Sequence, residues 1–244
     1  EILKKSGVDT SLVQTHESLE TGKVYVTLDE KGNGTYTITC PAAWDEIHTT
    51  EDMLEAAKEA DAIIYGSMGS RNKISQNTLK QLLEVSKFRV FDINLRPPFY
   101  STILIDELIQ NSDLVKLNDE ELEKYCELIG FKSNEMSKLI DFISNKYPGK
   151  VFCITKGENG ASILGDGDSF EHPGYKVNIA DTVGAGDGFL AGLVSRYLAG
   201  DPWPKALEYA CALGALVASK PTANPPVSES EIRSLIASRP DRNS

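Results

Sequence analysis

Apolar and polar positions alternate with two different periods along the chain. From Glu51 onward, short apolar runs that suit buried strands are separated by segments of about ten residues with helical periodicity. The pattern predicts strands at 62–65, 89–93, 114–117 and 151–155, with helices at 51–60, 75–85, 102–110, 119–128 and 135–145. Short buried strands that alternate with helices indicate a mainly parallel sheet covered on both faces, and therefore an α/β fold.

Two other regions have a different pattern. Before Glu51, two β-rich runs over 24–39 flank Asn33-Gly34, and this dipeptide is a strong signal for a hairpin turn. After the last buried strand, further β segments are predicted at 161–164 and 169–177, followed by helices at 186–198, 205–219 and 228–237. No internal repeat or low-complexity linker divides the chain, and its length fits one large α/β domain or two small ones.

Composition and charge exclude several classes of function. The 244 residues carry a formal net charge of -11, and a net-acidic surface disfavours sequence-independent binding to nucleic acid. No apolar run reaches the roughly 20 residues that a membrane-spanning helix needs. The four cysteines are scattered without a CxxC pair, which disfavours structural zinc and a disulfide framework and favours a reducing cytoplasm.

The most informative segment is a glycine loop, Asp181-Thr182-Val183-Gly184-Ala185-Gly186-Asp187, at the start of a predicted apolar helix. It lacks the GK[ST] of a phosphate-binding P-loop, and its match to a dinucleotide fingerprint is weak. The remaining interpretation is an anion hole, in which N–H groups of Gly184, Ala185 and Gly186 neutralise a phosphoryl group while Asp187 accepts a proton. The structural alternative is that Asp187 only favours the N-terminus of the helix.

This loop resembles the D-T-x-G-A-G-D signature of the ribokinase-like (PfkB) carbohydrate kinases, and three other segments match the family in the expected order. Asn118 and Glu121 fit its N-x-x-E element, and the resemblance implies that they shape the magnesium and phosphate environment. The nucleotide loop is similar at Thr155, Lys156, Gly157 and Gly160, and the resemblance adds Asp181 and Thr182 to the cofactor-binding residues. In the D-x-N-x-R segment, Asn94 and Arg96 are implied to lie near the transferred phosphate and the sugar.

Each of these shorter motifs also has a plain structural explanation. Asn118 could cap the helix that follows it, and the glycines of 155–160 are ordinary hairpin residues. Arg96, just before two prolines, could pair with any surface carboxylate. By resemblance the hairpin at 22–40 is part of a β lid over the sugar, with Tyr25 and Tyr36 as substrate-facing aromatics. Both tyrosines could equally pack beneath that lid.

The chain also departs from the family pattern. The family's first segment, with a central strand, a Gly-Gly-Asn sugar motif and half of the lid, has no counterpart here. Either the chain is a true fragment that lacks this segment or the natural protein carries it before Glu1, and we expect the second. Near the nucleotide, Thr222 replaces the glycine of the family's Gly-Ala pair, which affects the turn beside the monovalent-cation (K+) site that the family implies. Asn224 remains a candidate contact on the adenine side.

The resemblance implies a single three-layer α/β/α ribokinase-like domain over 1–244, with a small β lid. The function implied by the resemblance is ATP- and Mg2+-dependent phosphorylation of a sugar. Fructose is favoured because 43–47, Gly66-Ser67 with Arg71, and 94–96 are most similar to bacterial fructokinases. The alternatives are a 2-keto-3-deoxygluconate kinase, a ribokinase, or a non-catalytic relative that binds nucleotide or sugar. The expected partners are a small sugar and a second copy of the chain paired through the lid, without nucleic acid or membrane.

Overall fold

The computed structural model describes residues 2–28, 34–165 and 167–238. The chain divides into two compact units, one of Glu1–Arg89 with Asn94–Asn111 and one of Val90–Ile93 with Ser112–Ser244. In the described part of the chain, no helix is both long enough and apolar enough to cross a bilayer. Whether the chain behaves as one domain stays a prediction.

The first unit contains the hairpin and most of the N-terminal helices. Its elements are α1 (Ile2–Lys5), β1 (Val24–Leu28), β2 (Gly34–Ile38), η1 (Ala43–Glu46), α2 (Glu51–Glu59), β3 (Ile63–Gly66), η2 (Met68–Ser70), α3 (Lys73–Val85) and α4 (Thr102–Gln110). Side chains at the N-cap explain where the longer helices begin. Thr50, Asn72 and Ser101 each accept a hydrogen bond from a backbone N–H in the first turn of α2, α3 and α4.

The predicted hairpin is present. Strands β1 and β2 pair antiparallel, with Val24 opposite Ile38 and Leu28 opposite Gly34. Residues 31–33 of the predicted turn lie outside the described residues. Tyr25 is 56% exposed, whereas the side chain of Tyr36 also lies outside what the structure describes.

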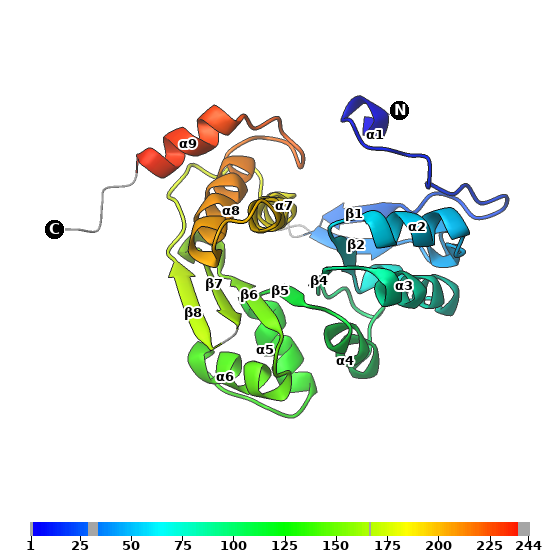
Figure 1. Cartoon of the computed structure of the whole chain (residues 1–244), viewed down its shortest axis with the longest axis horizontal. Helices are drawn as coiled ribbons and strands as arrows, with labels where there is room; N and C mark the ends of the chain where they lie inside the picture. Colours follow the sequence, from blue (N-terminus) through cyan, green and yellow to red (C-terminus); the bar gives the residue numbers. More distant parts are fainter. Residues whose placement is uncertain (1, 29–33, 166, 239–244) are drawn as a thin grey trace. The chain divides into compact units, whose positions relative to one another are not determined.

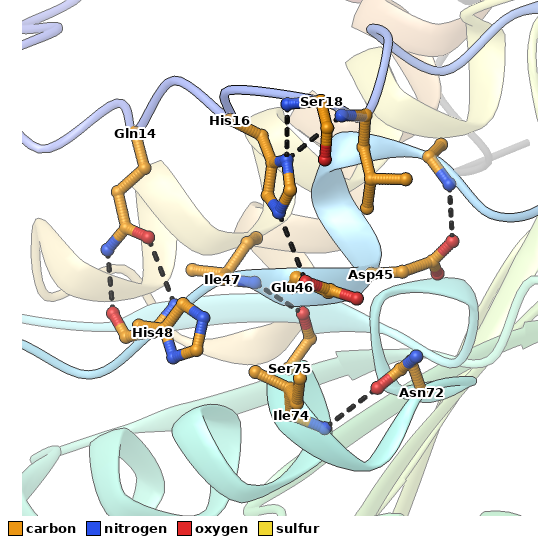
Figure 2. Close-up of polar contacts among 12 residues, drawn as sticks. Gln14, His16, Ser18, Asp45, Glu46, Ile47, His48, Asn72, Ile74 and Ser75 are labelled. Carbon is orange, nitrogen blue, oxygen red and sulfur yellow. Dashed lines mark hydrogen bonds and ion pairs between the residues drawn. The ribbon is translucent and has the colours of Figure 1, made fainter.

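Hydrogen bonds join the segment before the hairpin, at Gln14 and His16, to η1 and to the residues that follow η1 (Figure 2). Nδ1 of His16 accepts the backbone N–H groups of Ser18 and Leu19, which leaves the ring proton on Nε2, where it donates to Glu46 Oε2 at 3.0 Å. The side chain of Gln14 both donates to the carbonyl oxygen and accepts from the N–H of His48. His16 and His48 therefore have local structural roles.

The second unit is a layered α/β structure. Its elements are β4 (Arg89–Asp92), β5 (Leu114–Asn118), α5 (Asp119–Leu128), α6 (Met136–Lys146), β6 (Val151–Thr155), η3 (Gly157–Asn159), β7 (Ala161–Gly165), β8 (Asp168–His172), α7 (Ala185–Leu198), α8 (Trp203–Ala218) and α9 (Glu229–Ala237). Helix α8 packs on β7 and β8 and against α7, whereas α5 packs on β5 and β6 and against α6 (Figure 1). The sheet of this unit thus lies between two helical layers, as predicted.

Strands β4, β5 and β6 are parallel neighbours, and β7 and β8 extend the sheet with antiparallel pairing. Asp92 lies opposite Lys116, and Lys116 lies opposite Cys153, so these three residues form a row across the parallel strands. Directly opposite residues share one face of a sheet. The row is buried.

One strand prediction is wrong at its end. A strand was expected over 169–177, but β8 ends at His172. Pro173 has no N–H to continue the ladder, and Gly174 has a φ of 77°. A Cβ on Gly160 would lie 1.9 Å from the carbonyl oxygen of His172, so the turn after β8 also depends on a glycine in the loop after β6.

Candidate active site

The candidate site is centred on the start of α7, where the glycine loop meets the helix. Gly184 is the N-cap residue and has a φ of 81°, in the left-handed region that favours glycine. A Cβ on Gly184 would lie 1.8 Å from the carbonyl oxygen of Ala223. Glycine at this position therefore allows the chain after α8 to lie directly against the loop.

Backbone N–H groups at this helix start can bind an anion. The N–H of Ala185, one of the predicted donors, donates to the carbonyl oxygen of Thr182 at 3.2 Å and so helps to close the turn. Among the described residues, the N–H groups of Gly184, Gly186 and Asp187 have no hydrogen-bond partner. Unpaired N–H groups at a helix N-terminus, together with the helix dipole, favour negative charge.

The two aspartates of the loop have different surroundings. Oδ1 of Asp181 accepts the N–H of Val183 at 2.9 Å, so this carboxylate shapes the turn. Asp187 lies in the first turn of α7, where its side chain is exposed and has no hydrogen-bond partner among the described residues. An unengaged carboxylate beside unpaired N–H groups can accept a proton from a hydroxyl that approaches a bound phosphate.

Charged side chains lie in the sheet below the loop. Lys116 Nζ donates to Asp92 Oδ1 at 3.0 Å, and the two residues are each 8% exposed. Burial raises the pKa of Asp92, and the carboxylates of Glu121 and Asp187 raise it further, against the lowering effect of Lys116. A Cβ on Gly186 would lie 3.3 Å from Lys116 Nζ, so the ammonium group lies next to the glycine loop.

Asn118 and Glu121 form a capping box at the start of α5. The N–H of Glu121 donates to Asn118 Oδ1 at 2.7 Å, and the N–H of Asn118 donates to Glu121 Oε2 at 3.0 Å. The structural explanation for this pair is therefore present in the molecule. Part of each side chain's acceptor capacity is used by the cap, and the buried Glu121 carboxylate also acts electrostatically on Asp92.

The predicted nucleotide loop follows β6. Thr155 ends β6 and lies opposite Ala161 of β7, and the N–H of Lys156 donates to the carbonyl oxygen of Gly160 at 2.7 Å. The ammonium of Lys156 pairs with Glu171 at 2.9 Å. Gly157 and Gly160 have φ values of 55° and 80°, which explains the glycine at both positions.

A hollow of about 540 Å3 in the same unit is lined by Lys176, Val177, Asn178 and Ser219. The chain that leaves this hollow enters the glycine loop, and the N–H groups of Ala180 and Asp181 both donate to the carbonyl oxygen of Ala218 at the end of α8. Asn224 is exposed, next to the Ala223 that contacts Gly184.

The predicted sugar and phosphate contacts before 112 belong to the first unit. Asn94 has a φ of 43°, which is unusual for a residue with a side chain, and its carbonyl oxygen accepts from Ser67 Oγ at 3.4 Å. Arg96 is exposed, and its Nη1 donates to the carbonyl oxygen of Leu95. Among the described residues its guanidinium group has no other hydrogen-bond or ion-pair partner, which leaves it available to a ligand.

The first unit also contains a cavity of about 360 Å3, whose lining includes Cys40, Arg71, Phe99 and Tyr100. Arg71 Nε and Nη2 donate to the two oxygens of Asp45 at 2.6 and 2.7 Å. Burial would raise the pKa of Asp45, but the hydrogen bonds from Arg71 and from the backbone N–H of Ala42, together with the positive charge of Arg71, outweigh it and lower the pKa. The charge of Arg71 is thus neutralised within the unit.

Comparison with known proteins agrees with this geometry. Residues 1–230 match the family described as pfkB family carbohydrate kinase. The chain belongs to the pfkB family. The prediction made from the glycine loop and its companion motifs is confirmed.

Similar proteins include kinases named for different sugars. Fructokinase-1 from Oryza sativa subsp. japonica is 26% identical over 256 residues, which are 97% of this chain and 77% of that protein. An ATP-dependent ribose-1-phosphate kinase from Halopiger xanaduensis is 28% identical over 135 residues, which are 55% of this chain. The matched part covers 42% of the length of that kinase.

Solved structures of sugar kinases confirm the predicted ribokinase-like α/β fold. A 2-dehydro-3-deoxygluconokinase from Thermotoga maritima has a TM-score of 0.80 at 20% identity, with 96% of this chain and 79% of that chain covered. A fructokinase from Xylella fastidiosa with bound ATP has a TM-score of 0.79, also at 20% identity and with the same coverage of both chains.

The sequence motifs of the pfkB family pointed to the glycine loop but missed the pair below it. Asp92 is the first residue of the D-x-N-x-R motif and Lys116 lies two residues before the N-x-x-E motif, but the motifs alone assign neither a role. A signal was available in the sequence, because each is a charged residue with an apolar residue on either side of it in a predicted strand. The register that brings them together is a tertiary property, and it becomes visible only when β4 and β5 are paired.

Proposed function

We propose that this pfkB protein transfers the γ-phosphate of ATP to a hydroxyl group of a sugar, with Asp187 as the general base. The observation that carries the proposal is the exposed carboxylate of Asp187 beside the unpaired N–H groups of Gly186 and Asp187. The sugar oxygen attacks the γ-phosphorus while its proton passes to Asp187, and the bond to ADP breaks. The N–H groups stabilise the charge on the transferred phosphoryl group.

The nucleotide is placed along the glycine loop and the hollow beside it. In this proposal the phosphates lie at the start of α7, near Thr182 and the loop at 155–160. The adenine ring of the nucleotide faces the hollow lined by Lys176, Val177, Asn178 and Ser219, and Asn224 lies at the edge of the adenine site. The ATP bound to the Xylella fastidiosa fructokinase supports a nucleotide role for this fold.

The donor set suits Mg2+ that arrives with the nucleotide. Among the described residues, no group of three or more His, Cys, Asp or Glu side chains could hold a metal ion. Mg2+ is commonly bound by one or two carboxylates together with substrate phosphates and water, and Glu121 and Asn118 match that sparse set. When bound, Mg2+ would neutralise phosphate charge. The need for K+ stays a prediction.

Fructose is the proposed sugar, with Arg96, Asn94, Tyr25 and Tyr36 as its contacts. Fructokinases are among the similar proteins, and one from Vibrio cholerae O395 has fructose, ADP and calcium bound. An acidic substrate such as 2-keto-3-deoxygluconate would need a free cation. Arg71 is already paired with Asp45, so Arg96 remains as the candidate. Pairing of two copies through the lid stays a prediction.

The proposal is tested by measuring ADP release from Mg-ATP with the full-length protein and a panel of fructose, ribose, 2-keto-3-deoxygluconate, glucose and adenosine. We expect selective turnover with fructose. Replacement of Asp187 by Asn should lower kcat by about 10²-fold or more, because the base is lost while the shape of the side chain is kept. Asp168→Asn, at the exposed start of β8, is the matched control and should keep wild-type turnover.

Each contrary outcome has a distinct meaning. Full turnover by the Asp187→Asn variant would remove Asp187 as the base. Turnover with another sugar would keep the kinase and change its substrate. Binding of ADP without turnover of any sugar would favour a non-catalytic relative.

A further inference from the structure

An ammonium group is buried in the sheet directly below the glycine loop. Lys116 lies in the middle of β5, whose residues Leu114, Val115 and Leu117 are fully buried. Lysine is almost never buried unless it is paired, because removing an ammonium ion from water is costly. The ammonium group of Lys116 therefore needs an anionic or hydrogen-bonding partner at this position in β5.

Asp92 accounts for only part of what this ammonium group can bind. Lys116 Nζ carries three N–H donors, and Asp92 Oδ1 is its one hydrogen-bond partner among the described residues. Across the sheet from Lys116 lies Cys153, a thiol that is a weak acceptor. A buried ion pair alone contributes little to stability compared with apolar side chains of similar size, so a structural role alone explains this pair poorly.

The position of the ammonium group points to the second partner. It lies 3.3 Å from where a Cβ on Gly186 would be, beside the N–H groups of Gly186 and Asp187, which have no hydrogen-bond partner among the described residues. The other charged groups around Asp92 are the carboxylates of Glu121 and Asp187. In this cluster, Lys116 is thus the cation available to a phosphate at the start of α7.

We propose that Lys116 is a fixed cation that binds the γ-phosphoryl group of the nucleotide from below the glycine loop, and that Asp92 is the residue that positions its ammonium group. The inference rests on the proposed kinase function, because it needs ATP at the start of α7. During transfer the phosphorus–oxygen bond to ADP breaks and a bond to the sugar oxygen forms. The sugar proton goes to Asp187, and Lys116 stays protonated throughout.

The absence of a side chain at 186 fits this arrangement. A contact of 3.3 Å between Cβ and nitrogen is tighter than most real contacts, so alanine at 186 would press on the ammonium group. Glycine leaves the space between Lys116 and the helix start open.

The experiment compares two nucleotides that differ in the γ-phosphate. Calorimetry with Mg2+ gives the Kd of ADP and of the non-hydrolysable ATP analogue AMP-PNP for wild type and for Lys116→Met. We expect the AMP-PNP affinity to fall by about tenfold or more, as for loss of one charge-assisted hydrogen bond, while the ADP affinity changes by less than about threefold. With sugar and ATP, kcat should fall by about 10²-fold with the KM of the sugar little changed.

Three further variants separate charge from structure. Lys116→Arg keeps the charge and should recover part of the preference for AMP-PNP, whereas Asp92→Asn should give an intermediate loss because the ammonium group is less well held. The double variant Asp92→Asn/Lys116→Met removes both charges of the pair and leaves neither of them buried without its partner. If Lys116→Met does not fold, this variant is used to measure the expected loss of AMP-PNP affinity. Lys150→Met is the matched control, because its ammonium group is also partly buried but binds the carbonyl oxygen of Ser112.

The outcomes distinguish this inference from the function on which it depends. Equal loss of ADP and AMP-PNP affinity in Lys116→Met, or loss of neither, would overturn the role of Lys116 and leave the kinase proposal standing. A wild-type protein that binds neither nucleotide would overturn the proposed function, and this inference with it.

Discussion

Burial gives the four cysteines of this chain different chemistry. Cys40 is exposed at the wall of the cavity in the first unit, whereas Cys126, Cys153 and Cys211 are buried. Burial raises the pKa of Cys126 to about 11. Burial also raises the pKa of Cys153, and the nearby Cys211 adds to this effect. Because the thiolate is the reactive form, burial and the raised pKa values of Cys126 and Cys153 disfavour reaction at those thiols, whereas exposure favours reaction at Cys40.

We predict that one thiol reacts rapidly with Ellman's reagent in the native chain at pH 8 and that four react in denaturant. The rapid thiol is Cys40, so Cys40→Ser should remove the native reaction and leave three thiols in denaturant. Cys126→Ser is the control, because it should leave the native reaction unchanged. Rapid reaction of two or more native thiols would contradict the burial of Cys126, Cys153 and Cys211.

At the level of residues, the sequence alone identifies a functional side chain when the residues that form its site are neighbours in the chain. Asp187 and Gly184 were found because their roles come from one turn of backbone. Lys116 and Asp92 were missed because 24 positions separate them in the chain, and they meet only through strand register. The ion pair between Arg71 and Asp45 has the same cause, with 26 positions between its members.

At the level of elements, one pair of side chains has two explanations. Asn118 and Glu121 satisfy each other's backbone N–H groups at the start of α5, which is enough to explain their spacing. The proposed Mg2+ role would use the negative charge of Glu121 in addition. The capping box tolerates Gln as well as Glu at the third position, so the two roles can be separated by one substitution.

We expect Glu121→Gln to keep the cap and lose the metal contact. The Tm should stay within about 2 °C of wild type, because the hydrogen bonds of the cap are retained. The Mg2+ concentration needed for half-maximal turnover should rise by about tenfold, because one charged ligand is replaced by a neutral one. Both values come from a thermal melt and a Mg2+ titration at saturating ATP.

A second capping box supplies the control. Ser228 and Glu231 form the same reciprocal bonds at the start of α9, so Glu231→Gln makes the same chemical change away from the glycine loop. It should leave the Mg2+ requirement unchanged. An unchanged requirement in Glu121→Gln as well would show that Glu121 only caps α5.

Helix boundaries were predictable where a residue that can cap the helix stands directly before a segment with clear helical periodicity. The helices at 102–110 and 119–128 were predicted with the bounds that α4 and α5 have, because Ser101 and Asn118 cap them. Strand ends were harder to predict, since the end of β8 depends on Pro173 and on packing against Gly160. The antiparallel direction of β7 and β8 likewise follows from short turns, whereas α/β alternation suggests only parallel pairing.

At the scale of the whole molecule, charge is the property that acts on the nucleotide at a distance. The chain has 25 basic and 36 acidic residues and a formal net charge of -11. Mg-ATP is also an anion, so the summed field of the protein opposes its approach, while local groups such as Lys116 and the start of α7 attract it. The two effects differ in range and can therefore be separated with salt.

We predict that the affinity for Mg-ATP analogues increases with salt at low ionic strength. The Debye length falls from about 30 Å at 0.01 M to about 8 Å at 0.15 M, which screens the distant carboxylates more than contacts inside the site. The Kd of AMP-PNP with Mg2+ held constant should fall by about two- to threefold over this range. The KM of a neutral sugar should stay nearly constant and serves as the internal control. A steady weakening of AMP-PNP binding with salt would mean that the local cations, Lys116 first among them, dominate the field that the nucleotide meets.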